Sequence, residues 1–399
     1  MKNQFALSNQ QLLNIANDLR QKIETGLRKD GTEIKCLPTY IHPKKDGIKG
    51  ETTVFDLGGT NFRAAVVSVG IETKITGLAE KNITEMKTAG FTEADLYNSE
   101  AETIRRLNIP ANSSIGYCFS YPAKPLLNGD AELIVWTKGV NIPGMTGKPI
   151  GAPMVKYLNE KLNTGFNGKI AVVNDTITSL FAGLANPGFD AYIGLIVGTG
   201  TNMATFFPSD YIPKITGMDA WSGETTVNLE SGNYTPAHLT AFDAKVDEES
   251  DNKGFQRFEK AIAGMYLGRI FRAVYPNDEL DESLDAAALS RMMNHPDEYK
   301  SEYVETAFQI YERSAKLVAA SLAGLVLNLN SAYPSVKTVQ VLAEGSLFWS
   351  KVKTNNTAYV DVVNETLKEL LTEAGIKSIV RISRIENANL IGAAMSVLS

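Results

Sequence analysis

The sequence is poor in cysteine and histidine, and it carries no excess of positive charge. Two cysteines, Cys36 and Cys118, are too few for a disulfide framework in 399 residues and are typical of a reducing compartment. The three histidines are scattered and give no zinc-site spacing. A net charge of −6 argues against nucleic acid or an anionic membrane surface as a partner. We therefore expect two ordinary buried thiols, no structural zinc and no nucleic-acid partner.

Long hydrophobic runs are also lacking. The longest apolar stretch, residues 317–327, contains Ser321 and Gly324 and is too short to span a bilayer, so we predict a buried helix there. The first residues show no positively charged start followed by an apolar run, which is what a signal peptide requires. We accordingly expect a cytoplasmic protein with no membrane partner.

Two common phosphate-binding motifs, GxxxxGK[ST] and a GxGxxG after a strand, are absent, so a nucleotide would have to be held in another way. The stretch 52–69 offers another way to hold a nucleotide, because its pattern predicts two buried strands joined by the turn DLGGTNFR. Gly58 and Gly59 leave backbone N–H groups open to phosphate oxygens. Asp56 can hold a metal ion or its water, and Arg63 can meet phosphate charge. The alternative is a plain tight turn with one structural ion pair.

A similar pattern returns later in the chain. Residues 192–197 and 202–206 read as strands, and the turn Gly198-Thr199-Gly200-Thr201 joins them. No acidic residue stands at the position matching Asp56. We interpret the recurrence as an internal duplication, with two similar domains that each open with a phosphate-facing hairpin.

Helical and strand patterns alternate throughout, which predicts an α/β protein. The first helix, 7–28, should begin with a capping box formed by Ser8 and Gln11. The Gly-, Pro- and Asn-rich segment 129–147 is predicted to be a functional loop, and 219–251 is expected to be polar and irregular. Further helices are predicted at 94–107, 153–163, 177–184, 258–274, 302–329, 358–373 and 388–397, and strands at 75–86, 115–120, 170–173, 337–343 and 378–382.

Asp175 directly follows the apolar strand 170–173, and a carboxylate at the end of a buried strand is where open α/β folds place their chemistry. The alternative is that Asp175 is only the N-cap of a helix starting at Thr176.

Seven segments occur in a specific order: FDLGGTNFR, FSYP, WTKGV, VVNDT, LIVGTGTN, FEKAIAGMYLG and EGSL. Each is weak alone, but together they span nearly the whole chain. With this order and spacing the sequence resembles the hexokinase family, which has the two-domain actin-like ATPase (ribonuclease H-like) fold with a cleft between a small and a large domain. The resemblance implies a small domain of 46–175 plus 384–399, and a large domain of 1–45 plus 176–383.

The resemblance also implies an activity, the transfer of the γ-phosphoryl group of ATP to the 6-hydroxyl of glucose or a related hexose. Asp175 matches the general base, with Lys138 and Arg63 beside the transferring phosphate, and Asp56 would hold Mg²⁺ through water. The positions that match sugar ligands are Ser120, Thr137, Lys138, Asn174, Asp175, Asn202, Glu230 and Glu259. Those that match nucleotide ligands are Asp56, Gly58, Gly59, Thr60, Asn61, Arg63, Gly198, Thr199, Gly200, Gly345 and Ser346.

Three positions depart from the family pattern. Tyr121 stands where Phe is common, and Glu344 replaces the usual Asp before Gly345. Ser231 replaces a Trp after Glu230, so we expect a less firmly supported Glu230 and a hexose range that includes mannose, unless Trp221 or Tyr234 supplies the missing bulk.

Two other functions remain open. One is a kinase for fructose or an amino sugar, and the other is a sugar sensor that kept the fold and lost turnover. The bacterial sugar kinases with a cysteine-rich zinc motif are excluded, because two distant cysteines cannot supply it.

Overall fold

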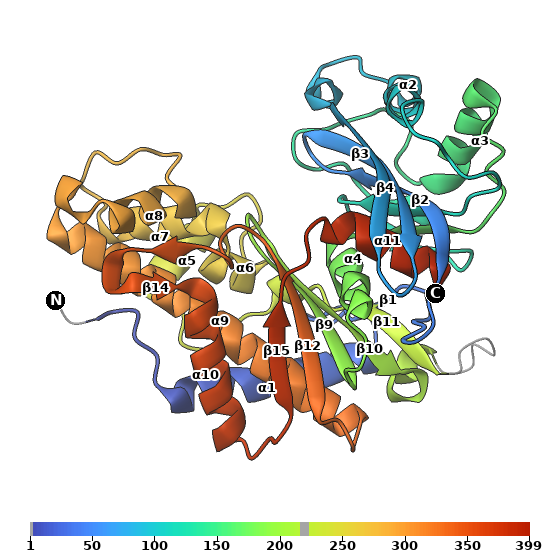
Figure 1. Cartoon of the computed structure of the whole chain (residues 1–399). Coiled ribbons are helices and arrows are strands. Elements are labelled where there is room, and N and C mark those ends of the chain that lie inside the picture. Colours follow the sequence, from blue (N-terminus) through green and yellow to red (C-terminus); the bar gives the residue numbers. More distant parts are fainter. Residues whose placement is uncertain (1–2, 216–222) are drawn as a thin grey trace.

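The computed structural model describes residues 3–215 and 223–399, which form two lobes, each built around its own sheet (Figure 1). The smaller lobe holds five strands in the order β4-β3-β2-β5-β8. The predicted first hairpin is confirmed, since β2 pairs antiparallel with β3 and Asp56 lies opposite Arg63. The strands are β2 (Gly50–Leu57), β3 (Asn61–Val69), β4 (Lys74–Asn82), β5 (Ile115–Phe119) and β8 (Ile170–Val173).

The larger lobe repeats this topology, with the strand order β1-β11-β10-β9-β12-β15. β9 and β10 form the second antiparallel hairpin, and β12 and β15 continue the sheet in parallel, as β5 and β8 do in the first. The five strands from β11 to β15 therefore match the small-lobe sheet in order and direction, as the predicted duplication requires, and β1 is an additional edge strand. The strands are β1 (Leu37–Pro38), β9 (Ala191–Val197), β10 (Thr201–Pro208), β11 (Glu224–Asn228), β12 (Thr338–Glu344) and β15 (Ile379–Ser383).

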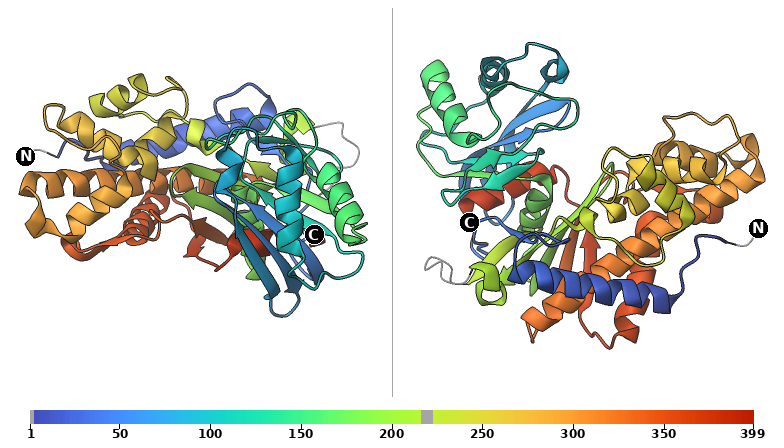
Figure 2. Two further views of the ribbon diagram at one scale, coloured as in Figure 1. Left: turned by 90° about the horizontal axis from the view of Figure 1, so that it is seen from above. Right: turned by 180° about the vertical axis from the view of Figure 1, so that it is seen from behind.

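Helices cover both sheets, and the two further views show α1 and the long α9 crossing the larger one (Figure 2). α1 (Asn9–Arg28) begins with the predicted capping box of Ser8 and Gln11. α9 (Ser301–Ala332) is long and apolar enough to cross a membrane, but 78% of its most apolar window is buried inside the protein. The others are α2 (Glu93–Ile104), α3 (Gly151–Leu162), α4 (Asp175–Ala182), α5 (Ala241–Glu248), α6 (Arg257–Ile262), α7 (Gly264–Val274), α8 (Ala286–Asn294), α10 (Tyr359–Glu373) and α11 (Ala388–Leu398).

The region expected to be irregular, 219–251, is partly regular. Residues 219–222, with Trp221, lie outside the described residues. After these residues β11 pairs with β10. Thr225 and Thr226 of β11 are fully buried, and the polar sequence of this segment did not predict their burial. α5 begins with a capping box of Thr240 and Asp243. The loop 129–147 is mostly irregular, as predicted, and carries only the short strand β7 (Ala131–Leu133).

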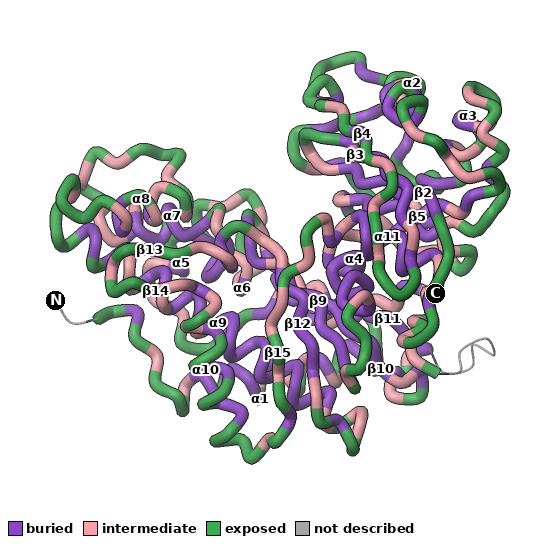
Figure 3. The backbone as a smooth tube through the Cα atoms, in the orientation of Figure 1, coloured by how far each residue is buried: buried purple, intermediate pink, exposed green. Residues whose placement is uncertain are grey.

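Each lobe has its own hydrophobic core, and a third cluster joins them. This third cluster packs α4 and α11 between the two sheets, and these helices are purple, that is buried, over most of their length (Figure 3). The helices cross very closely, because a Cβ on Gly392 would lie 1.8 Å from the Thr178 carbonyl oxygen. The two lobes are therefore linked through one tight helix pair beside the predicted site.

Candidate functional site

The first glycine turn holds Asp56 in an ion pair. Arg63 Nε donates to Asp56 Oδ2 at 3.0 Å, and Asn389 Nδ2 lies 3.4 Å from the same oxygen. The structural ion pair that we weighed as the alternative is thus present. The other carboxylate oxygen, Asp56 Oδ1, lies 3.5 Å from Asn389 Nδ2.

The turn also presents backbone N–H groups. Gly58 N donates to Asn61 O at 3.0 Å and closes the turn from one side. The Gly59 N–H has no acceptor within residues 3–215 and 223–399, and Thr60 and Asn61 are exposed. A free N–H between exposed residues suits a phosphate oxygen.

Asp175 is the first residue of α4, and Asn174 is its N-cap, with Oδ1 accepting from Ile177 N at 2.9 Å. The alternative that made Asp175 the N-cap is therefore wrong, because Asn174 already fills that position. Burial raises the pKa of Asp175, and the nearby Lys138 cation opposes the rise. A carboxylate with a raised pKa accepts a proton more readily, which suits a general base.

Lys138 lies close enough to Asp175 for its charge to act on the carboxylate, and it is also bonded to Ser120. Lys138 has a positive φ of 58°, and its Nζ donates to the Ser120 carbonyl oxygen at 2.7 Å. Thr137 precedes it and is half-buried. The small-lobe candidates for sugar binding therefore form one group with the candidate base.

The buried Cys118 connects this group with the first turn. Burial raises the pKa of its thiol well above the usual value, and the charges of Asp56 and Asp175 add to the rise. The two carboxylates are thus close to each other, and the Asp56 charge also raises the pKa of Asp175. Both cysteines are buried, as expected.

On the larger lobe, Glu230 is held by a chain of amides. Asn202 Nδ2 donates to Asn228 Oδ1 at 2.7 Å, and Asn228 Nδ2 donates to Glu230 Oε1 at 2.8 Å. Ser231, only 1% exposed, bonds through its N–H to Asn202 Oδ1. These contacts support Glu230 in place of the missing indole. The Tyr234 hydroxyl donates to Ile15 O and Asp18 Oδ2 of α1, and its ring packs against Phe258 with centroids 5.8 Å apart.

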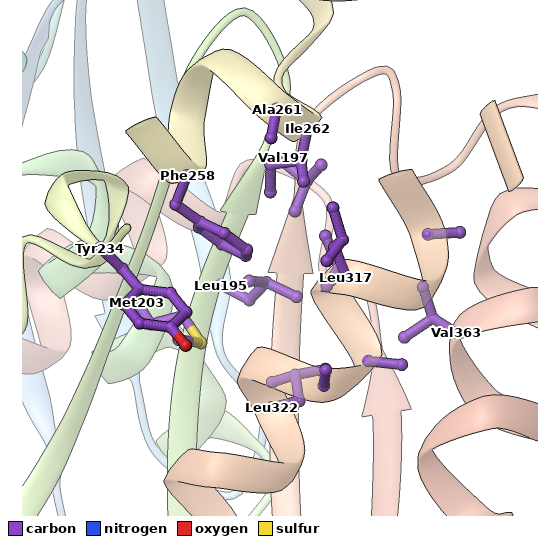
Figure 4. Close-up of a cluster of buried hydrophobic side chains, with 14 of the residues drawn as sticks. Leu195, Val197, Met203, Tyr234, Phe258, Ala261, Ile262, Leu317, Leu322 and Val363 are labelled. Carbon is purple, nitrogen blue, oxygen red and sulfur yellow. The ribbon is translucent and has the colours of Figure 1, made fainter. Parts of the chain in front are cut away.

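Glu259 lies next to this chain of amides. Its Oε2 accepts from Thr201 N at 3.0 Å, and burial together with the Glu230 charge raises its pKa. A Cβ on Gly200 would lie 2.7 Å from the same oxygen, so the glycine makes room for the carboxylate. α6 carries Glu259 and is anchored by Phe258, Ala261 and Ile262, which point into the core beside Val197 (Figure 4).

The two groups of sugar candidates are not joined to each other. No hydrogen bond or ion pair in the described part of the chain links Thr137 or Lys138 to Glu230 or Glu259. They stand on different lobes, connected by the α4–α11 pair.

The second glycine turn meets the EGSL segment. Gly345 has φ of 114°, and a Cβ there would lie 2.1 Å from Val197 O, so only glycine fits. The carbonyl oxygens of Gly198 and Thr199 accept from the first N–H groups of α7, at 2.7 and 3.3 Å. This bonding fixes the turn to α7.

A cavity of about 360 Å³ opens at this turn. It contains three of the predicted nucleotide ligands, Gly198, Thr199 and Ser346. The sequence analysis did not assign the rest of its lining, because most of these residues come from α7, α8 and the loop before α8, far from the turn in sequence. They include Met265, Arg269, Leu284, Ala287 and Ser290, and Ser350 follows the EGSL segment. A larger hollow of about 520 Å³ beside α3 contains none of the predicted site residues.

Glu344 ends β12 next to this turn. Its Oε1 is buried with no hydrogen-bond partner among the described residues, and burial raises its pKa, opposed by Arg384 and Arg63. No group of three or more His, Cys, Asp or Glu side chains able to hold a metal occurs in the described part of the chain. A single carboxylate such as Asp56 fits Mg²⁺ that keeps most of its water and is bound mainly by phosphate.

Two family models described as hexokinase match the chain, one over residues 1–184 and the other over 192–307 and 274–399. Hexokinase-7 of Oryza sativa subsp. japonica is 28% identical over 418 residues, which cover 92% of this chain and 88% of that protein. Hexokinase-3 of the same species is 35% identical over 267 residues, and human Hexokinase-3 is 33% identical over 282. These two matches span only 52% and 30% of the relatives' own lengths.

Among solved structures, a hexokinase from Schistosoma mansoni complexed with glucose superposes with a TM-score of 0.77 at 23% identity. The match covers 99% of this chain and 96% of that one. The two-domain fold expected from the sequence is thereby confirmed over the full length.

Proposed function

The chain belongs to the hexokinase family, and we propose that it transfers the γ-phosphoryl group of ATP to the 6-hydroxyl of glucose and related hexoses. The observation that carries the proposal is Asp175. This carboxylate begins α4 beside Lys138, and its raised pKa suits proton acceptance. It is also electrostatically close to Asp56 on the first glycine turn.

The sugar is bound from both lobes in this proposal. Ser120, Thr137, Lys138 and Asn174 contact it from the small-lobe side, and Asn202, Glu230 and Glu259 from the large-lobe side. Carboxylates and amides suit this task, because adjacent hydroxyls need several directional donors and acceptors. Glu230 is already oriented by Asn228 and Asn202, so it meets the sugar without further ordering.

The nucleotide lies across the two glycine turns. The free Gly59 N–H supports a phosphate contact at the first turn, and the cavity beside Gly198, Thr199 and Ser346 supports a base and ribose site at the second. Arg63 and Lys138 supply positive charge near the transferring phosphate. Asp56 holds the hydrated Mg²⁺ that, when bound, neutralises charge on the phosphates.

Proton transfer completes the reaction. As the 6-hydroxyl attacks the γ-phosphorus, its proton passes to a carboxylate oxygen of Asp175, and ADP leaves. In the described part of the chain no hydrogen bond or ion pair joins the sugar residues of the two lobes, which supports a closure step. Such a step is needed because water is a competing nucleophile and must be excluded until the sugar is in place.

The domain boundaries and the location of the protein belong to the same proposal. We assign 46–175 plus 384–399 to the small domain and 1–45 plus 176–383 to the large one, which agrees with the separate cores. Two buried, unpaired cysteines suit a reducing compartment and support a cytoplasmic location.

A coupled assay for ADP release tests the proposal. We expect release that depends on glucose and on Mg²⁺, with little release from ATP alone. Sugar binding without ADP release would instead identify a sensor, and release with fructose or an amino sugar alone would identify a different sugar kinase.

A further inference from the structure

We infer that Tyr121 is a positioning residue that fixes the Gly58–Gly59 peptide of the first turn for nucleotide binding. The inference rests on the proposed function, and it concerns a position where the family commonly has Phe. The phenol hydroxyl that distinguishes the two side chains donates to the Gly58 carbonyl oxygen at 3.0 Å.

The Gly58 carbonyl has no other donor within residues 3–215 and 223–399. In a tight turn the C=O of the first residue often accepts a hydrogen bond from the N–H of the residue three positions later. Here Gly58 N donates to Asn61 O, but Asn61 N does not donate to Gly58 O. The Tyr121 hydroxyl therefore supplies the hydrogen bond that the turn itself leaves unmade.

The orientation of one peptide plane follows from this bond. A trans peptide is planar, so the Gly58 C=O and the Gly59 N–H point in opposite directions. Glycine on both sides gives this peptide unusual freedom to rotate. Holding the carbonyl thus holds the Gly59 N–H, the donor that has no acceptor in the described part of the chain.

Tyr121 is itself firmly placed. It is 3% exposed, and its ring packs edge-on against Trp136 with centroids 4.7 Å apart. Lys138 Nζ lies 5.2 Å from the ring centre on another side. Lys138 also lies against the turn, since a Cβ on Gly59 would be 3.2 Å from its Cδ. Tyr121 is therefore a rigid support between the sugar side and the phosphate side of the small lobe.

The test is Tyr121→Phe, which removes only the hydroxyl. The control is Tyr157→Phe on α3, which also loses one hydroxyl and one hydrogen bond, to Asn98 Oδ1 at 2.7 Å. Steady-state KM values for ATP and glucose are measured for both variants. Calorimetry gives the Kd of the Mg²⁺ complex of a non-hydrolysable ATP analogue, and thermal melts check folding.

A single neutral hydrogen bond changes an equilibrium by about 2- to 10-fold. We expect Tyr121→Phe to raise both the KM for ATP and the analogue Kd by about that factor, while the KM for glucose stays within about 2-fold. Tyr157→Phe should leave all three constants unchanged.

Unchanged nucleotide affinity in Tyr121→Phe overturns the inference. An equal loss of affinity for ATP and glucose, or the same effect in Tyr157→Phe, also overturns the inference. Either result would mean that removing a hydroxyl loosens the small lobe as a whole. If the wild type does not phosphorylate glucose, the proposed function fails, while the analogue Kd still decides the role of Tyr121.

Discussion

Glu100 allows a pH-dependent stability effect to be predicted in magnitude and sign. This α2 residue is completely buried in the core of the small lobe, away from the candidate site. Tyr117 Oη donates to its Oε1 at 2.7 Å, and Oε2 has no partner in the described part of the chain. Burial raises the pKa of Glu100 to about 8, and the Tyr117 hydrogen bond only partly opposes the rise.

The sign follows from proton linkage. The folded protein holds the Glu100 proton up to about pH 8, whereas the unfolded chain releases it near the ordinary value of 4.5. The folded state therefore binds more protons between these values, and its stability falls as the pH rises through that range. Each pH unit contributes about 1.4 kcal/mol, so Glu100 lowers the free energy of unfolding by about 3 kcal/mol between pH 4.5 and pH 7.

Glu100→Gln keeps the shape and the Tyr117 contact but cannot ionise. We expect the variant to be more stable than the wild type at pH 7, and the difference to shrink by about 3 kcal/mol as the pH falls to 5. Denaturant titrations of both proteins at several pH values, followed by a small-lobe signal, measure this difference. Because the wild type and the variant share every other titrating group, the contributions of those groups cancel in the stability difference.

Glu102→Gln is the matched control, because Glu102 lies on the same helix but is exposed. Lys81 lowers the pKa of Glu102 through a hydrogen bond and its charge, so its removal should have a small effect of opposite sign. A stability difference for Glu100→Gln that stays flat from pH 5 to 8 would refute the reasoning and show that Glu100 ionises in the folded protein as it does in water.

Four further predictions concern the lobes and the sugar site. Saturating glucose should reduce the radius of gyration in small-angle scattering, because the sugar contacts lie on both lobes, and an unchanged radius contradicts closure. Asn228→Ala removes the hydrogen bond to Glu230 and should lower kcat/KM for glucose by roughly 5- to 100-fold. In the same assay we expect the wild type to accept mannose, because Ser231 provides less bulk behind Glu230 than a Trp would, even though Asn202 and Asn228 orient the carboxylate. Strong rejection of mannose would contradict this expectation and show that these hydrogen bonds are sufficient support. Gly392→Ala should lower the melting temperature by several degrees, since its methyl group meets the Thr178 carbonyl. Gly70→Ala is the control, because Gly70 has no positive φ and a Cβ there would meet nothing nearer than 4.0 Å.

The elements with strong local signals could be predicted from the sequence. The capping box at Ser8 and the glycine turns beginning at Gly58 and Gly198 each depend on a few neighbouring residues, and all three are present. The matching strand orders of the two sheets followed from recognising that the hairpin recurs.

Contacts between distant segments could not be predicted in the same way. β11 has polar threonines that are buried beside other segments: Thr225 Oγ1 shares a hydrogen bond with Ser209 Oγ, and Thr226 Oγ1 donates to Ile41 O. The supports of Glu230 are Asn228, which is close in sequence, and Asn202, which is not. Much of the lining of the second-turn cavity comes from α7, α8 and the loop before α8, which lie far from the turn in sequence.

Asp175 illustrates both what the sequence predicts and what it does not. Its position after β8 could be predicted from the sequence, but the sequence did not show whether it caps the following helix. The structure decided it, because the side chain of Asn174 occupies the capping position.

The central claim is that Asp175 accepts the proton of a hexose hydroxyl, and Asp175→Ala tests it most directly. Glucose-dependent ADP release and calorimetric glucose binding are measured on the same preparations of wild type and variant. We predict that turnover falls by about 10²- to 10⁴-fold or more, while glucose still binds measurably, since proton acceptance matters only as the hydroxyl attacks. Turnover close to that of the wild type would contradict the account.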